Sequence, residues 1–314
     1  MAFSIKRYNA ATDQQIWNQF VEDSKQGTFL LNRSYMDYHS DRFEDHSLLI
    51  FKREKLYALL PGNQSDGIYY SHQGLTYGGL LTTTKTSAED VCEVFVAINS
   101  YLRQQGFLKV TYKAIPWIYQ QTPAEEDLYA IIKECHATLT VRNIASVIDI
   151  NHPLKWNRDR HYGANKAHTE GIFAEESKDF QAFWEILEDN LMSTYHTKPV
   201  HTLDEILLLK SKFPEAIRLY VAKKGDVTLG GTLLYITPQV VHAQYISATP
   251  EGKHGHAIDA IFRKILKEDC KDCKYFDFGT SNEDYGKVLN TSLIYQKEGF
   301  GGRGVCYDWY EWTL

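Results

Sequence analysis

Hydrophobic residues in the first half of the chain recur at helical spacing in some segments and at strand spacing in others. From 87 to 105, the N-cap residue Ser87 and an acidic first turn predict a helix with one apolar face. The residues of that face are Val91, Phe95, Ile98 and Leu102. The same patterns predict further helices at 13–25 and 34–42, and strands at 3–8, 47–51, 56–60, 67–81 and 108–115. This order of elements indicates an α/β domain.

The second half repeats this order after a break at 151–153. It predicts helices at 156–168, 179–192, 203–212 and 256–267, and strands at 217–222, 230–236, 240–248, 274–278 and 307–314. The two halves have little sequence similarity, so we infer a duplication from the order of their elements. The alternative is that two α/β halves resemble each other by chance. We expect two domains, 1–150 and 151–314, each a mixed twisted sheet flanked by helices.

Composition narrows the function classes. The 314 residues contain 34 Lys and Arg against 40 Asp and Glu, a net charge of −6 that both halves share, which disfavours a dedicated DNA-binding domain. The start lacks a signal peptide's apolar run, and the five cysteines do not suggest a disulfide framework. We therefore expect a cytoplasmic protein with reduced thiols. The pair Cys270 and Cys273 has metal-ligand spacing but no second pair nearby, so no metal site is predicted.

A phosphate site is the first candidate for chemistry. The segment between the predicted strand 240–248 and the helix that follows contains two glycines and several basic residues. Backbone N–H groups at the start of such a helix can bind phosphate. The candidate residues are Ala248, Gly252, Lys253, His254, Gly255, His256 and Ala257. The alternative is an ordinary connection in which the glycines only permit unusual backbone angles.

Two groups of residues resemble known families. The helix ending with Tyr295, Lys297, Gly299 and Phe300 resembles the late helix of the GNAT (GCN5-related N-acetyltransferase) superfamily. Its pyrophosphate loop corresponds to the segment from Gly252 to Ala257, with Gly252 at the usual Arg or Gln position. A closer resemblance is to the FemAB-like proteins, a tandem GNAT-fold branch that includes peptidoglycan bridge-forming peptidyltransferases. It is carried by the segments 275–279 and 297–302, which look like the ending of these proteins, and by 157–171, which looks like the helix that opens their second domain. The resemblance implies two tandem GNAT-like domains.

The resemblance also implies roles for single residues. Tyr295 takes the place of the acid that protonates the departing thiolate, and its alternative is a buried aromatic residue that bonds a carbonyl. The general base remains open among His196 and His201, in a loop near the acceptor side of this fold, and Glu251 or His254.

Other residues are expected to line the substrates. Gln244 and Tyr245 lie on the strand expected to face the acyl group. In the first half, no glycine turn leads into the helix at 87, so no second donor site is expected there. His72 and Tyr77 are expected to line an acceptor groove, or else to belong to a packed sheet edge.

The sequence therefore predicts an N-acyltransferase without metal. It would move an acyl group from acyl-CoA, such as acetyl-CoA, to an amine of a small-molecule or bacterial cell-envelope precursor. One alternative is FemAB-like transfer from aminoacyl-tRNA, which the acidic balance disfavours. Another is a non-catalytic GNAT-fold binding protein, which Gly252 at the usual Arg or Gln position keeps open. The acceptor and the oligomeric state do not follow from the sequence.

Overall fold

The chain forms two compact units. The computed structural model describes residues 3–270 and 272–314. Unit 1 comprises Met1–Asn143, Asp284–Lys287 and Cys306–Leu314, and unit 2 comprises Ile144–Glu283 and Val288–Val305. Two strands, β9 (Thr138–Asp149) and β17 (Arg303–Thr313), therefore contribute residues to both units. The last nine residues, which the sequence places in the second domain, group with unit 1.

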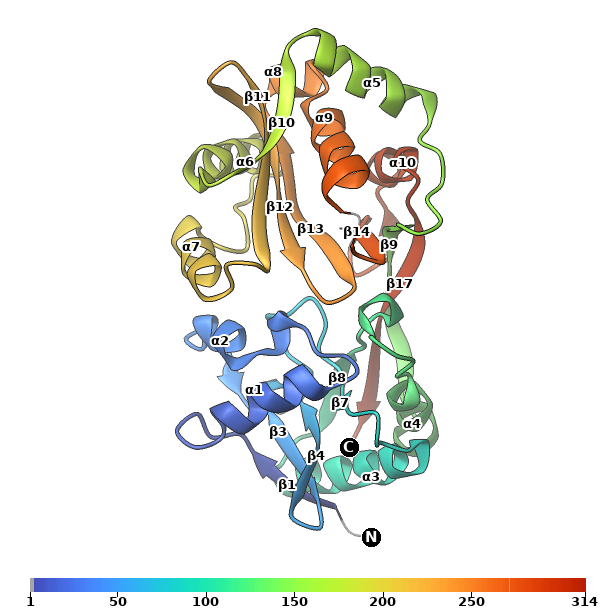
Figure 1. The fold of residues 1–314 in the computed structure, drawn as a ribbon. Coiled ribbons are helices and arrows are strands. Elements are labelled where there is room, and N and C mark those ends of the chain that lie inside the picture. Colours follow the sequence, from blue (N-terminus) through green and yellow to red (C-terminus); the bar gives the residue numbers. More distant parts are fainter. Residues whose placement is uncertain (1–2, 271) are drawn as a thin grey trace. The chain divides into compact units, whose positions relative to one another are not determined.

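The strands of unit 1 form two groups, and its helices lie between these strands along the sequence. The first sheet is antiparallel, with the order β1 (Phe3–Arg7), β3 (Leu48–Lys52), β4 (Lys55–Leu60), β7 (Leu81–Thr82). The second group contains β2 (Glu44–Asp45), β5 (Asn63–Ser65), β6 (Ile68–Tyr70), β8 (Lys109–Lys113) and the end of β17. The helices are α1 (Gln14–Asp23), α2 (Arg33–Met36), α3 (Ala88–Gln104) and α4 (Glu126–Cys135), with 3-10 turns at Phe29–Leu31, Asp37–His39 and Trp117–Tyr119. Figure 1 shows α3 and α4 side by side.

Helix α3 confirms the sequence pattern that predicts it. The Ser87 side chain accepts a hydrogen bond from the backbone N–H of Asp90, which caps the helix start. The predicted apolar face, Val91, Phe95, Ile98 and Leu102, is completely buried. The apolar spacing of this segment thus specifies both the helix and the side that enters the core of unit 1.

Unit 2 is a mixed sheet covered on both faces. Its strands are β10 (Ile172–Ser177), β11 (Ile217–Lys224), β12 (Val227–Ile236), β13 (Val240–Ala248), β14 (Tyr275–Thr280) and the end of β9, in that order. All neighbours are antiparallel except β13 and β14, which are parallel. The helices are α5 (Arg158–Thr169), α6 (Phe180–Tyr195), α7 (Leu203–Lys212), α8 (Pro250–His254), α9 (Ala257–Lys264) and α10 (Thr291–Gly299); a π-helical turn (Ile265–Asp269) and the small strands β15 (Asn282–Glu283) and β16 (Val288–Leu289) complete the unit.

The parallel pair β13–β14 requires a crossover, and α9 supplies it. Figure 1 shows α6 and α7 on one face of the sheet and α9 and α10 on the other. On the α9 face, Phe262 packs against Phe276, Phe278 and Phe300 with ring centroids 4.9–5.7 Å apart. This aromatic cluster fixes α9 against β14.

The segment expected to be a glycine turn is instead the short helix α8. Thr249 caps it by accepting a hydrogen bond from the backbone N–H of Gly252, and Pro250 occupies the first helical position. Proline is favoured there because its missing N–H has no intrahelical partner to lose. Local capping therefore outweighs the helix-breaking tendency of Gly252, and the helix ends at His254, before Gly255.

We expect Phe262→Ala to lower the free energy of unfolding by about 3–5 kcal/mol, because it leaves a cavity in the aromatic cluster. The matched control is Phe173→Ala on β10, where the ring is 57% exposed. That change should cost less than about 1 kcal/mol. Urea unfolding followed by fluorescence measures both variants, and equal losses would contradict the proposed role of the cluster.

Candidate functional site

The parallel strands β13 and β14 pair over only three residues. Val240, Val241 and His242 pair with Tyr275, Phe276 and Asp277. From Ala243 to Ala248, β13 has no paired residue on β14 within the described part of the chain. The backbone groups along this edge of β13 are therefore not used in pairing with β14, and an unpaired strand edge is a place where an extended ligand can bind through main-chain hydrogen bonds.

A β-bulge at Gln244 sets the direction of the side chains around this opening. Leu233 of β12 pairs with Tyr245, but the next residue, Leu234, pairs with Ala243, so Gln244 is the extra residue. Because the bulge shifts the alternation by one, residues 242 and 245 project from the same face. Tyr245 meets Trp184 of α6, with ring centroids 5.4 Å apart, so this face is the α6 face.

His242 and Asp277 lie on that face where the two strands separate. Their neighbours in sequence, among them Val241 and Phe276, belong to the core beneath α9. The Nδ1 atom of His242 lies 2.9 Å from Oδ2 of Asp277. The Asp277 carboxylate is fully buried and also accepts a hydrogen bond from the backbone N–H of Gly279 at 2.7 Å. Sequence analysis did not select His242, which is 35 residues from Asp277.

Lys297 of α10 holds the turn that follows β14. Its Nζ donates to the carbonyl oxygens of Gly279 and Thr280 at 2.9 and 2.8 Å, and contacts the hydroxyl of Ser281 at 3.0 Å. Burial lowers the pKa of Lys297 to about 8, although Asp277 opposes the change. The segments 275–279 and 297–302, which the sequence analysis took together as one resemblance, thus meet through this ammonium group.

Tyr245 and His201 are brought together, whereas His196 is not part of this contact. The Tyr245 hydroxyl lies 2.7 Å from Nδ1 of His201 and accepts a hydrogen bond from the backbone N–H of His201 at 3.3 Å. Burial raises the pKa of Tyr245. His196 is exposed and ends α6 in a left-handed conformation. Gln244 is half-buried at the bulge.

The glycines of the predicted phosphate segment are closely packed against strands. A Cβ atom at Gly252 would lie 2.1 Å from the carbonyl oxygen of Leu229, and one at Gly255 would lie 2.5 Å from Ile172. Lys253 reaches across to the side chain of Asn190 on α6. Both glycines thus have a packing reason to be present, independent of any ligand.

The first turn of α9 contains a buried carboxylate, that of Asp259. Asp259 is 3% exposed, accepts a hydrogen bond from Arg160 of α5 at 3.0 Å and contacts His256 at 3.1 Å. Burial raises the pKa of Asp259, and Arg160 opposes the change. Gly163 of α5 leaves room for this contact, since a Cβ there would lie 2.6 Å from the His256 ring. An anion near a helix start is stabilised by the helix dipole, and Asp259 fills this role internally.

The remaining predicted residues lie at separate places. Tyr295 is 59% exposed on α10, whereas Ala248 and Ala257 are buried and His254 is exposed. His72 and Tyr77 belong to unit 1 and are buried. Tyr77 donates to or accepts from the hydroxyl of Thr28 at 3.1 Å, and the His72 ring stacks on His39 with centroids 5.3 Å apart.

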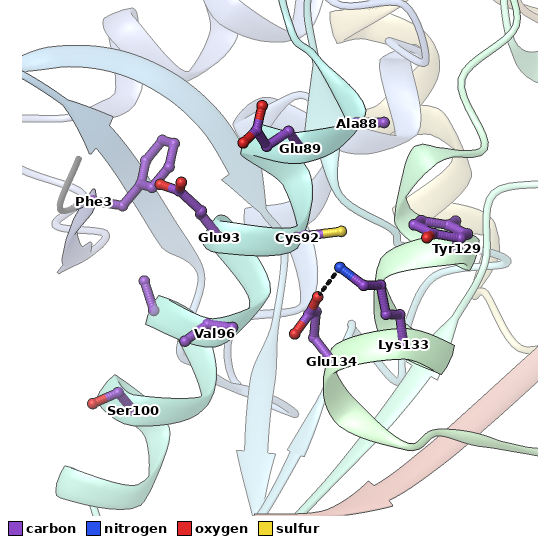
Figure 2. Close-up of a pocket in the computed structure, with 11 residues that line it drawn as sticks. Phe3, Ala88, Glu89, Cys92, Glu93, Val96, Ser100, Tyr129, Lys133 and Glu134 are labelled. Atoms are coloured by element: carbon purple, nitrogen blue, oxygen red, sulfur yellow. Dashed lines mark ion pairs between the residues drawn. The ribbon is translucent and has the colours of Figure 1, made fainter.

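A groove of about 700 Å³ lies in unit 1 between α3 and α4. Figure 2 shows Cys92 and Val96 of α3 facing Tyr129 and the ion pair of Lys133 with Glu134 on α4. None of the predicted site residues lines it. Across residues 3–270 and 272–314, no cluster of three or more metal-binding side chains occurs. In the same part of the chain, no helix has both the length and the apolar character to span a bilayer.

Comparison with known proteins agrees with this architecture. Residues 157–287 match the family model for the acetyltransferase (GNAT) domain. FemX has a similar structure, with a TM-score of 0.69 at 9% identity over 99% of this chain and 97% of that one. The C-terminal domain of a protein named as a lysylphosphatidylglycerol synthetase from Agrobacterium fabrum gives 0.61 at 11% identity, over 96% and 92%. A tandem GNAT protein from the clavulanic acid pathway gives 0.50 at 9%, over 99% and 98%.

These likenesses establish the fold. Residues 157–287 match a GNAT domain, and the chain has the fold of FemX and of a tandem GNAT protein, in agreement with the two GNAT-like domains that the sequence predicts. A search of curated proteins gave no significant match. At 9–11% identity, these neighbours share the fold of the chain.

The buried Lys297 predicts a specific dependence of stability on pH. Its pKa is about 8 in the folded chain and 10.5 ordinarily, so between these values the unfolded state binds more protons and stability rises with pH. The difference in unfolding free energy between the native protein and Lys297→Met should therefore grow by up to about 3 kcal/mol from pH 8 to 10.5. Urea titrations across this range measure it. The exposed Lys178 provides the control variant Lys178→Met, for which the difference should not vary, and a flat difference for Lys297→Met would refute the assignment.

Proposed function

We propose that unit 2 of this FemAB-like GNAT-fold chain transfers an acyl group from acyl-CoA to an amine. The observation that carries the proposal is the unpaired edge of β13 from Ala243 to Ala248, beside a strand that separates after His242. The pantetheine arm of CoA is an extended chain with two amides, so it can pair with such an edge as a further strand would. The thioester would then lie near the point where β13 and β14 separate.

The side chains around that point fit acyl transfer. Tyr245 and Gln244 lie along the open part of β13, and His242 lies at its start. A polar face supported by an apolar core is suited to hold a carbonyl carbon and an attacking nitrogen in fixed positions. Lys253 and His254, on α8 shortly after β13, are candidates for phosphate contacts, and Tyr295 of α10 is the proposed acid for the departing thiolate.

The acceptor proposed is an amine on a cell-envelope precursor or a small molecule. One structural neighbour is named as a lysylphosphatidylglycerol synthetase, and that product is a lipid that carries an aminoacyl group. The shared fold supports an envelope acceptor by analogy. His201 is proposed to contact the acceptor, because it is fixed on the same face by Tyr245. His72 and Tyr77 are buried within unit 1, which favours the packed-edge alternative for them, and His196 is exposed where α6 ends.

A second candidate, transfer from aminoacyl-tRNA, is favoured by the start of α9. The packed glycines and the buried Asp259 leave less opportunity for a pyrophosphate than an open glycine loop would. A donor that carries its acyl group on a ribose ester requires no pyrophosphate contact at this turn. Binding of charged tRNA should weaken steeply with salt, because each phosphate contact releases counterions.

The test is a thiol-release assay with a panel of acyl-CoA thioesters and amines, together with calorimetry of CoA binding. Acyl-CoA transfer predicts free thiol, an amide product and heat of CoA binding. If neither thiol release nor CoA binding occurs, the acyl-CoA proposal fails. Transfer of label from charged tRNA to an envelope precursor, lost as salt rises, would then establish the second candidate.

We expect Tyr245→Phe to lower kcat/KM about 10-fold or more, because it removes the hydroxyl that fixes His201 beside the open strand edge. The matched control is Tyr220→Phe, which removes another buried hydroxyl of unit 2, bonded to Asp269 at 2.9 Å. The control should retain kcat/KM within about twofold. Equal loss in the two variants would indicate a general effect on stability, and no loss in Tyr245→Phe would remove Tyr245 from the proposed site.

A further inference from the structure

His242 lies at the junction between paired and unpaired β13. It is the last residue of β13 that pairs with β14, and its partner in the register is Asp277. Its side chain is 12% exposed, whereas that of Asp277 is fully buried. The imidazole thus extends from a buried carboxylate toward the point where an acyl group on the strand edge would begin.

The buried carboxylate determines which nitrogen of His242 is basic. Asp277 accepts at 2.9 Å from Nδ1 of His242, and its other oxygen accepts from the backbone N–H of Gly279. A carboxylate accepts hydrogen bonds and does not donate them, so Nδ1 carries the proton in the neutral ring. The Nε2 atom is then an acceptor, and it has no hydrogen-bond partner among the residues that the structure describes.

The turn after β14 is shaped to accommodate this ring. Gly279 has φ +74°, a left-handed conformation that glycine adopts readily, and a Cβ there would lie 3.3 Å from Cε1 of His242. Lys297 fixes the same turn through the carbonyl oxygens of Gly279 and Thr280. Glycine and lysine therefore act as positioning residues for the pair, with Lys297 the charged group beside Asp277.

Unit 2 has two other His–Asp pairs among the described residues. In the pair of His256 with the buried Asp259, the carboxylate also accepts a hydrogen bond from Arg160, at the start of α9. The remaining pair is exposed. His152 and Asp149 have their Nδ1 and Oδ2 atoms 3.1 Å apart, but their side chains are 84% and 44% exposed. Water competes for both groups there, so the carboxylate does not hold the ring in one tautomer. Burial of Asp277 makes the equivalent contact of His242 an oriented one, as in the carboxylate–histidine pairs of hydrolytic triads.

We infer that His242, oriented by Asp277, is the general base of the transfer reaction, an inference that rests on the proposed function of unit 2. Nε2 removes a proton from the acceptor nitrogen as the C–N bond to the acyl carbon forms. The C–S bond then breaks and its electron pair leaves on sulfur, which takes a proton from the proposed acid Tyr295, and the proton on His242 returns to Tyr295 through solvent. An amide and a free thiol result, and His242 is neutral again. With an ester donor, the C–O bond breaks and ribose oxygen takes the proton.

The first test is catalytic. We expect His242→Gln to lower kcat about 100-fold or more and to abolish the acidic limb of the pH–rate profile, with KM for the thioester changed less than about threefold. Asp277→Asn should also lower kcat, because an amide can donate to Nδ1 and favour the wrong tautomer. The matched controls, His152→Gln and Asp149→Asn, should keep the native rate and profile. If His242→Gln keeps the kcat and pH–rate profile of the unmodified protein, the inference is overturned. The proposed function would still stand in that case, provided that the unmodified protein releases thiol.

The second test does not depend on activity. In protein labelled with ¹⁵N-histidine, two-bond ¹H–¹⁵N spectra identify which ring nitrogen carries the proton. We expect the native His242 signal to show a protonated Nδ1, and Asp277→Asn to lose that preference while the His152 signal stays unchanged. A native Nε2–H tautomer would overturn the inference. If no donor supports transfer by the native protein, the proposed function fails, and the inference fails with it whatever the tautomer.

Discussion

Three residue pairs hold the parallel strands β13 and β14 together, between Val240–His242 and Tyr275–Asp277. Each further pair would add main-chain hydrogen bonds, but it would also close the edge at which the donor is proposed to bind. The aromatic cluster beneath α9 keeps the strands fixed on one face, so the other face can carry polar groups without loss of the fold. The separation of the strands is therefore maintained by the core, and unit 2 offers an unpaired strand edge in a rigid setting.

The same arrangement explains why charges are buried beside this opening. An isolated buried carboxylate or ammonium group is costly, and here each is satisfied by several hydrogen bonds. Asp277 contacts an imidazole and a backbone N–H, and Lys297 contacts two carbonyl oxygens and a hydroxyl. Because these contacts join α10, the turn after β14 and β13, the geometry of the pair depends on tertiary structure. Such a network specifies one arrangement of the strands as well as stabilising it.

Local signals predicted the elements well and the site only in part. The capping box at Thr202 and Glu205 places α7 at the predicted residues 203–212, and the apolar face of α3 is as expected. These features depend on residues three or four positions apart. By contrast, α8 replaced an expected glycine turn, and α4 and β10 were not predicted. In α8 the cap by Thr249 and the packing of Gly252 decide the conformation.

Long-range relations account for what the sequence could not show. His242 and Asp277 are 35 positions apart, and nothing local marks either as one of a pair. Asp259 at the start of α9 bonds Arg160, 99 positions earlier, so the sequence did not show that a buried carboxylate occupies this helix start either. The resemblance to FemAB-like proteins did include the segments that contain Asp277 and Lys297. Both residues belong to the buried hydrogen-bond network around His242, but the resemblance did not indicate their contacts.

The bulge at Gln244 has a consequence for how β13 can change. At 9–11% identity, aligned residue types carry almost no information about which positions correspond. A one-residue change of phase in a strand is different, because deleting it would turn His242 and Tyr245 to opposite faces and expose the apolar side of the strand. The packing side chains of β13 can therefore change more easily than that extra residue can be removed. The bulge thus fixes the phase of β13, and with it the side of the sheet on which His242 and Tyr245 lie.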